Sequence, residues 1–204
     1  MLTITYHGHA CFSVTCSGFT VVLDPYQNGS VPGLPDLDLE ADRVLCSHEH
    51  HDHNGRDCVR LRTGGIDPFR ITEIGSFHDD CGGAKRGTNV IRVLEAEGLR
   101  VAHFGDLGCA LTAEQAGLLK NLDAALIPVG GFYTIGPAQA QALIETVKPR
   151  VVIPMHYKRG SSGLPVIAEL DDFLRLRTNT VEYPANTLNL TAATAPQTAV
   201  LRLP

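Results

Sequence analysis

The segment "SHEHHDHNG" (residues 47–55) holds four histidines, one glutamate and one aspartate in nine positions. So many polar and ionisable side chains in succession do not favour a helix or the interior of a sheet. His48 and His50 are two apart, so in an extended chain they point to the same side and can bind one cation. Asp52 and His53 follow, where a turn can bring them to a neighbouring cation. The spacing favours a metal site over the alternative of a polar loop that happens to contain histidines.

Three further groups stand at the ends of apolar, strand-like segments. His78 follows "ITEIGSF", Asp106 follows "LRVAHFG", and His156 follows "VVIPM". Strand ends gather along one edge of a layered sheet, so we expect these groups to converge with residues 47–55. Asp106 is the candidate bridge between two ions. Imidazoles and carboxylates without thiolates suit zinc, and also manganese, iron or nickel. His51 is expected to face solvent and is not counted as a ligand.

The remaining pattern predicts an α/β protein. Apolar and polar residues alternate at the N-terminus, "DRVLCS" predicts a short buried strand, and "RITEIGSF" another. Residues 88–106 predict a hairpin that turns at Glu97 and Gly98. Three helices are expected, over residues 112–122, 137–147 and 165–177. Without repeats or linkers, we expect a single domain over residues 1–204, built as a layered α/β sandwich.

Composition narrows the choice of partners. The chain has 204 residues, a net charge of -5, 44% hydrophobic and 19% charged residues, which is typical of a soluble globular protein. The acidic balance argues against a nucleic-acid or membrane partner, so we expect a small-molecule substrate. No signal-peptide pattern is present, and the six cysteines form no CxxC pair, so we predict reduced thiols and a cytoplasmic location. The oligomeric state stays open.

The motifs together resemble a known family. "SHEHHDH" is similar to the HxHxDH signature of metallo-β-lactamase-fold hydrolases, and Asp24 in "VVLDP" and His156 in "IPMHY" occur in the same order as in that superfamily. "YHGHACFSV", "RGTN", "HFGDLG" and "PVGGFYT" resemble a small branch of metal-dependent hydrolases that is distantly similar to the L-ascorbate-6-phosphate lactonases. The resemblance covers nearly the whole chain. It implies a four-layer αβ/βα metallo-β-lactamase-like sandwich with a dinuclear site on one edge.

The resemblance also implies a ligand set, carried over position by position. The first metal would be held by His48, His50 and His78. The second would be held by Asp52, His53 and His156, with Asp106 between the two ions. Asp24 would brace the ligand loop from outside.

Two divalent ions, with zinc as the first choice, define the expected chemistry. A zinc-bound water has a pKa near about 7, so hydroxide is available at neutral pH to attack an ester, lactone or phosphoester. Asp52 would orient that hydroxide or accept its proton. Two alternatives stay open: an iron-dependent redox enzyme on the same fold, and a metal-binding protein without turnover.

Several other residues are candidates for the surroundings of the site. His9, His103 and Tyr133 could each support the ligands or the substrate, and each could equally be a packing residue. Gly131, with Gly130 before it, is expected to allow close backbone approach at the rim. Cys109 stands where related chains often have histidine, and its role stays open.

Cations near the expected ligands suggest an anionic substrate. Arg86 and Lys158 lie on loops that leave the metal edge, and Asn89 could add a hydrogen bond. Arg86 could instead form an internal ion pair with Asp79 or Asp80.

Overall fold

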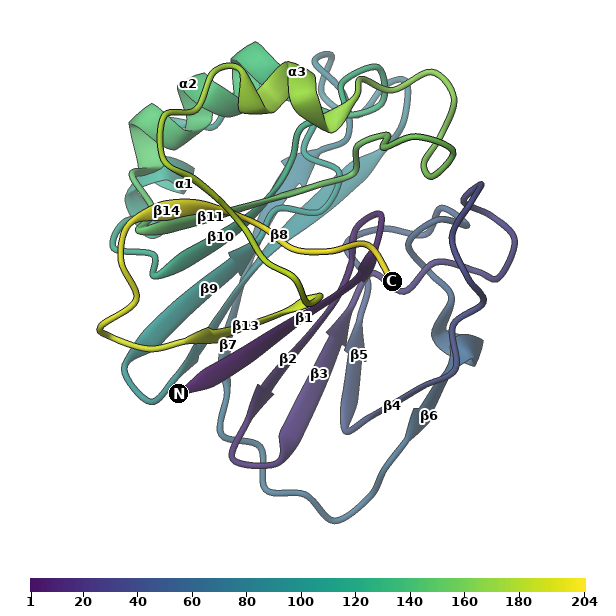
Figure 1. Ribbon diagram of the computed structural model, residues 1–204, viewed down its shortest axis with the longest axis vertical. Coiled ribbons are helices and arrows are strands. Elements are labelled where there is room, and N and C mark those ends of the chain that lie inside the picture. The colour runs from purple at the N-terminus through teal and green to yellow at the C-terminus, as the bar shows by residue number, and fades with distance from the viewer.

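The computed structural model describes residues 1–204 and contains two large β-sheets that face each other (Figure 1). The first sheet has the strand order β13-β1-β2-β3-β5. Its strands are β1 (Leu2–Gly8), β2 (Cys11–Cys16), β3 (Phe19–Leu23), β5 (Arg43–Leu45) and β13 (Thr187–Leu190).

The second sheet has the order β12-β14-β11-β10-β9-β8-β7. Its strands are β7 (Arg70–Phe77), β8 (Thr88–Ala96), β9 (Leu99–His103), β10 (Ala124–Pro128), β11 (Val151–Met155), β12 (Thr180–Glu182) and β14 (Gln197–Val200). A separate pair joins β4 (Leu39–Ala41) to β6 (Val59–Leu61). The helices are α1 (Ala113–Leu118), α2 (Pro137–Val147), α3 (Leu170–Leu174) and the 3-10 turn η1 (Arg56–Cys58).

Local sequence explains several of these elements. In β1, Leu2, Ile4 and Tyr6 are buried while the residues between them are partly exposed, as expected for a strand with one covered face. The β8–β9 hairpin turns at Glu97 and Gly98, both with positive φ, which matches the twist of the flanking strands. Strands β10 and β11 are buried throughout, because parallel strands inside a layered protein are covered on both faces.

The layers pack through two apolar cores. The larger core lies between the sheets and continues under α2, whose Ala140, Leu143, Ile144 and Val147 are buried. Helices α1, α2 and α3 lie on the outer side of the seven-stranded sheet (Figure 1). A smaller core covers the other face of the first sheet, where residues of β2 and β3 meet the segment after β3; it is formed by Cys11, Val22, Tyr26, Val31, Leu37, Ala41 and Val59. The predicted α/β sandwich is confirmed, although the outer layer over the first sheet consists of loops, η1 and the β4–β6 pair.

Three local predictions are wrong in detail. The helix predicted over residues 112–122 ends at Leu118, where the guanidinium of Arg100 binds the backbone oxygens of Leu118 and Lys120. The helix predicted over residues 165–177 is only five residues long, because the backbone before it bonds elsewhere: Ala168 N–H donates to Gly130 O, and Lys158 N–H donates to Ala168 O. The strand predicted in "DRVLCS" lies at the edge of its sheet and exposes Arg43. None of the helices combines the length and apolar character needed to cross a bilayer.

Candidate metal centre

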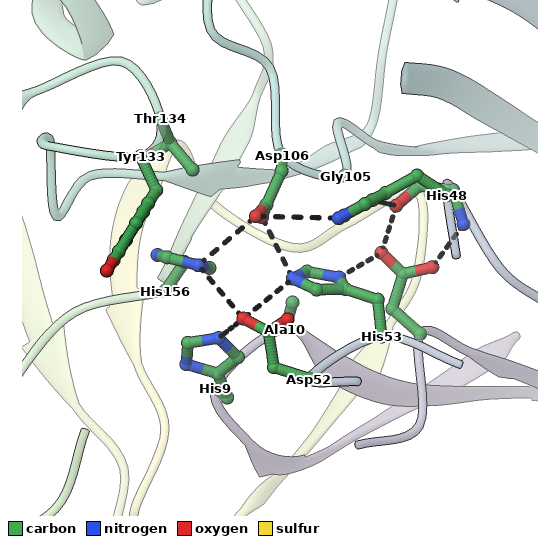
Figure 2. A network of polar contacts seen from close by, with 12 residues as sticks. His9, Ala10, His48, Asp52, His53, Gly105, Asp106, Tyr133, Thr134 and His156 are labelled. Atoms are coloured by element: carbon green, nitrogen blue, oxygen red, sulfur yellow. Dashed lines mark hydrogen bonds and ion pairs between the residues drawn. The ribbon is translucent and has the colours of Figure 1, made fainter. Parts of the chain in front are cut away.

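The cluster of histidines and aspartates lies where strands of both sheets end. Residues 48–53 follow β5, and Asp24 follows β3 in the first sheet. From the second sheet, His78 directly follows β7 and His156 directly follows β11, while Asp106 comes three residues after β9. The structure therefore brings together groups that are more than 100 residues apart in the chain (Figure 2).

Three groups of ligand atoms meet a common distance limit. One of them, Asp24 with His48 and His53, overlaps the two groups described next. The first contains His48, His50 and His78, whose ligand atoms all lie within 4.8 Å of one another. The second obeys the same limit and contains His9, Asp52, His53 and His156.

Asp106 lies between the two groups. Its Oδ2 is 3.1 Å from His78 Nε2 and 3.9 Å from His48 Nε2 on one side. On the other side, Oδ2 is 3.3 Å from His156 Nε2, and Oδ1 is 3.1 Å from His53 Nε2. The carboxylate is 1% exposed, so it faces the histidines instead of solvent. One aspartate thus contacts both ligand groups.

Outer hydrogen bonds set the tautomers of three histidines. His53 Nδ1 lies 2.8 Å from Asp24 Oδ2, His48 Nδ1 lies 2.9 Å from Ser47 Oγ, and His78 Nδ1 lies 3.1 Å from the backbone oxygen of Tyr133. An N–H on each Nδ1 satisfies these acceptors and leaves the Nε2 lone pair free. Metal-binding histidines commonly show this arrangement.

Asp24 organises this outer layer. It is 1% exposed, and its carboxylate accepts hydrogen bonds from Ser47 N at 2.6 Å and Ser47 Oγ at 2.5 Å, besides His53. Burial opposes its charge, but His103 and the hydrogen bond from His53 lower the pKa of Asp24 to about 2. The hydroxyl of Ser47 contacts both Asp24 and His48 and so connects them. Nothing in the sequence around Ser47 predicts this role.

The donor set fits divalent cations. His48 Nε2, His53 Nε2, His156 Nε2 and Asp106 Oδ1 are buried and have no hydrogen-bond partner. Unpaired buried polar atoms are costly in a folded chain, and a cation coordinated by them removes that cost.

Charge states in the metal-free chain are consistent with this fit. Burial and the neighbouring His53 lower the pKa of His48 to about 3, so its imidazole is neutral. Burial opposes the charge of Asp106, but His156 and His53 hold the pKa of that carboxyl well below its usual value. Burial also disfavours protonated His156, yet Asp106 outweighs it and raises the pKa of His156 to about 9. A cation would displace that proton.

A cavity of about 400 Å³ opens onto the cluster. It is lined by Ser30, Glu49, His50, His51, Asp52, His78, Arg86, Asp106, Tyr133 and Leu164. His51 is exposed, as predicted, but lies on the cavity wall. Ser30, Glu49 and Leu164 were not anticipated, since no local pattern marks them. Glu49 pairs with Arg56 at 2.6 Å.

Some of the residues considered for substrate binding line the cavity, and others do not. Arg86 and Tyr133 line the cavity, and the guanidinium of Arg86 lies 5.4 Å from the centre of the Tyr133 ring. Lys158 does not reach the cavity, because its Nζ pairs with Glu169 Oε1 at 2.8 Å. The ion pair considered between Arg86 and Asp79 is absent; the Asp79 carboxylate instead accepts the backbone N–H of Arg86.

Other expected residues lie in the scaffold around the cluster. Asn89 is fully buried, and its Oδ1 accepts the N–H of Asp106 at 2.9 Å, so it holds the ligand loop. His103 hydrogen-bonds to Ala10 O and to Gly105 N through its two ring nitrogens. Cys109 lines a separate, mainly apolar cavity of about 210 Å³.

Of the two glycines expected to allow close backbone approach, Gly130 does so, against the backbone of His156. A side chain at Gly130 would place Cβ 2.1 Å from the backbone oxygen of His156. Gly131 has φ 65°, which a glycine adopts without strain.

Comparison with known proteins gives a consistent picture. Residues 3–156 match the family described as the β-lactamase superfamily domain. A metal-dependent hydrolase of Korarchaeum cryptofilum is 32% identical over 189 residues, which cover 78% of this chain and 84% of that protein. A metal-dependent hydrolase of Thermococcus onnurineus is 29% identical over 211 residues, covering 86% of this chain and 92% of that protein. The crystal structure of a protein from Thermotoga maritima, assigned as a Zn-dependent hydrolase of the metallo-β-lactamase superfamily, has a TM-score of 0.77 and 32% identity, with 100% of both chains covered.

Proposed function

The chain belongs to the β-lactamase superfamily and is a metal-dependent hydrolase, and from this premise we propose that it uses two divalent ions, zinc in the first instance, to hydrolyse a small anionic ester, lactone or phosphoester. In this proposal His48, His50 and His78 hold one ion. Asp52, His53 and His156 would hold the other, with Asp106 between the two groups.

The position of Asp106 carries the proposal. Its two oxygens lie within 3.1–3.3 Å of three histidine nitrogens that come from both ligand groups. A buried carboxylate that contacts imidazole nitrogens from both ligand groups offers the oxygen and nitrogen donors that zinc prefers.

The residues around the proposed ions would divide the work of hydrolysis. Divalent ions bound here supply a water of lowered pKa and polarise a substrate oxygen. Asp52 lines the cavity, so its carboxylate can orient the attacking water and accept its proton. Tyr133 fixes His78 through its backbone oxygen, and its ring forms part of the cavity wall.

Metal content tests the ligand assignment. Protein purified without chelator is expected to contain about two equivalents of divalent metal by elemental analysis. His50→Ala and Asp106→Ala should each lose at least one equivalent. His51→Ala is the matched control, because His51 is an adjacent histidine that belongs to neither ligand group. Unchanged metal content in both ligand variants would refute the assignment.

Arg86 supports the preference for an anion. Its guanidinium faces the cavity without a carboxylate partner, since Asp79 is occupied by backbone N–H groups and Glu49 by Arg56. The contact with the Tyr133 ring holds the planar guanidinium of Arg86 toward the cavity. There it can bind a phosphate or carboxylate through two parallel hydrogen bonds.

A substrate panel of lactones, phosphodiesters, thioesters and β-lactams tests both the reaction and the preference. For a substrate that is turned over, Arg86→Ala should raise KM for an anionic form by about 10–100-fold, as expected for the loss of a charge-assisted hydrogen bond. KM for a neutral analogue and the metal content should not change. Lys158→Ala is the control, since Lys158 is paired with Glu169 outside the cavity. Equal effects of Arg86→Ala on both analogues would exclude electrostatic recognition.

A further inference from the structure

His9 lies in the turn between β1 and β2, and its side chain lies beside that of Asp52 at the centre (Figure 2). Its side chain is fully buried. Its Nε2 lies 3.1 Å from Asp52 Oδ2, 43 residues away in the sequence. The same oxygen lies 3.6 Å from His53 Nε2 and 3.9 Å from His156 Nε2. Three imidazole nitrogens therefore surround one carboxylate oxygen.

The surroundings of His9 differ from those of the scaffold histidines. His103 is equally buried, and both of its ring nitrogens have hydrogen-bond partners outside the cluster. His7 lies in β1, two residues before His9, and its Nε2 is hydrogen-bonded to Ser13 Oγ at 2.9 Å. His9 has no partner for Nδ1, and its only side-chain partner is Asp52. His9 thus differs from His103 because its Nε2 faces ligand atoms of the cluster, whereas both nitrogens of His103 bond to backbone atoms.

The backbone holds His9 in this position at a cost. Its φ is 54°, in the left-handed region that few non-glycine residues adopt, although asparagine, aspartate and histidine do so more often than the others. Two bonds to its carbonyl oxygen fix the turn: the backbone N–H of His156 donates at 2.8 Å and Tyr6 Oη donates at 3.2 Å. The rings of His9 and His156 are 4.0 Å apart between centroids. Strain that places a side chain against ligand atoms indicates a functional position.

We propose that His9 is an additional ligand of the second metal ion, beside Asp52, His53 and His156. This inference rests on the proposed dinuclear function and extends it. The two sites would then be unequal, because the second would have three histidines and Asp52, whereas the first would have three histidines without a carboxylate of its own. Asp106 would be shared.

Cobalt titration of the metal-free protein tests this ligand directly, because the visible absorption of Co²⁺ depends on the number and type of its ligands. The parent should bind two equivalents. His9→Gln keeps an amide N–H that can donate to Asp52 but removes the imidazole. His9→Asn is the second variant, since asparagine tolerates the left-handed backbone and the shorter side chain does not reach the ion. His7→Gln is the matched control, because His7 lies two residues away in β1 and belongs to neither ligand group.

We expect both His9 variants to bind one of the two equivalents at least 10-fold more weakly, and to show altered absorption bands when saturated with Co²⁺. His7→Gln should behave as the parent. Parent-like affinity and bands in both His9 variants would overturn the inference. Weaker binding with unchanged bands at saturation would also overturn it, since His9 would then only position Asp52. A parent that binds fewer than two equivalents would refute the dinuclear proposal itself. Unfolding curves of the metal-free variants establish that each is folded.

Discussion

Single residues at the centre combine unusual backbone geometry with close packing. His9, Asp24 and His156 all have positive φ, between 45° and 54°, at points where the chain turns away from a strand. The backbone oxygen of His156 faces Gly130, and the absence of a side chain there allows the approach. The position of the His156 ring therefore depends on a glycine in another loop.

Gly130→Ala is expected to displace the His156 loop. The added Cβ would lie 2.1 Å from a backbone oxygen, which cannot rotate away as a flexible side chain could. We expect the free energy of unfolding to fall by about 2 kcal/mol, within the range for overpacked sites, and metal binding to weaken. Urea denaturation and metal titration measure both. Gly75→Ala in β7 is the control, because its Cβ would meet nothing within 4 Å; equal stability of the two variants would contradict this account.

At the scale of elements, the loop between β7 and β8 carries Arg86 to the cavity. Its fold depends on Asp79, which is 2% exposed. The carboxylate accepts the backbone N–H groups of Cys81, Gly83, Lys85 and Arg86 at 2.8–2.9 Å. Desolvation opposes the charge, but the N–H of Arg86 and the donors of Cys81 and Gly83 hold the pKa of Asp79 well below its usual value.

Asp79→Asn should destabilise the protein in a pH-dependent way. Because the pKa is lower in the folded than in the unfolded state, ionised Asp79 stabilises the fold above its unfolded pKa of about 4 and loses this effect as pH falls below it. The difference in free energy of unfolding between parent and variant should thus be full at pH 7 and shrink toward pH 3. Urea denaturation at several pH values measures it. Asp80→Asn, in an exposed pair with Lys85, should have little effect. A difference that does not vary with pH would exclude the ionised carboxylate as its cause.

At the scale of the whole molecule, the centre lies where the two sheets meet. The proposed ligands follow β5 in one sheet and β7, β9 and β11 in the other, so bound cations would join the sheets at one edge. Without cations, several buried ligand atoms have no partner.

Removal of metal is therefore expected to lower the melting temperature. Free metal at about 1,000 times its Kd adds about 4 kcal/mol to stability, and each kcal/mol shifts Tm by about 2–4 °C in a chain of this size. Dialysis against a chelator should lower Tm by roughly 10 °C, and added Zn²⁺ should restore it, as measured by thermal unfolding. Asp106→Ala should show a smaller difference. A Tm that is the same with and without chelator would contradict a metal that joins the sheets.

Local sequence was sufficient for features that depend on neighbouring residues. The hairpin at Glu97 and Gly98 follows from backbone preferences, and the start of the helix expected from residue 112 follows from local side-chain capping. The α/β class and the superfamily follow from motifs at strand ends, as the comparisons confirm. The convergence of His78, Asp106 and His156 could be expected because the ends of strands meet at one edge of a sheet.

Only the tertiary structure decided which side chains meet across loops. It places His9 against Asp52, turns Asn89 toward the backbone of Asp106, and pairs Lys158 with Glu169 instead of the cavity. It also delays the start of α3 to Leu170, since the backbones of residues 158 and 168 bond to each other. These contacts depend on how two sheets and their loops pack together, and the energy of each is set by partners far away in the chain. Spacing within a segment cannot encode that choice, because the same segment can point the same side chain to solvent, to an ion pair or to a metal.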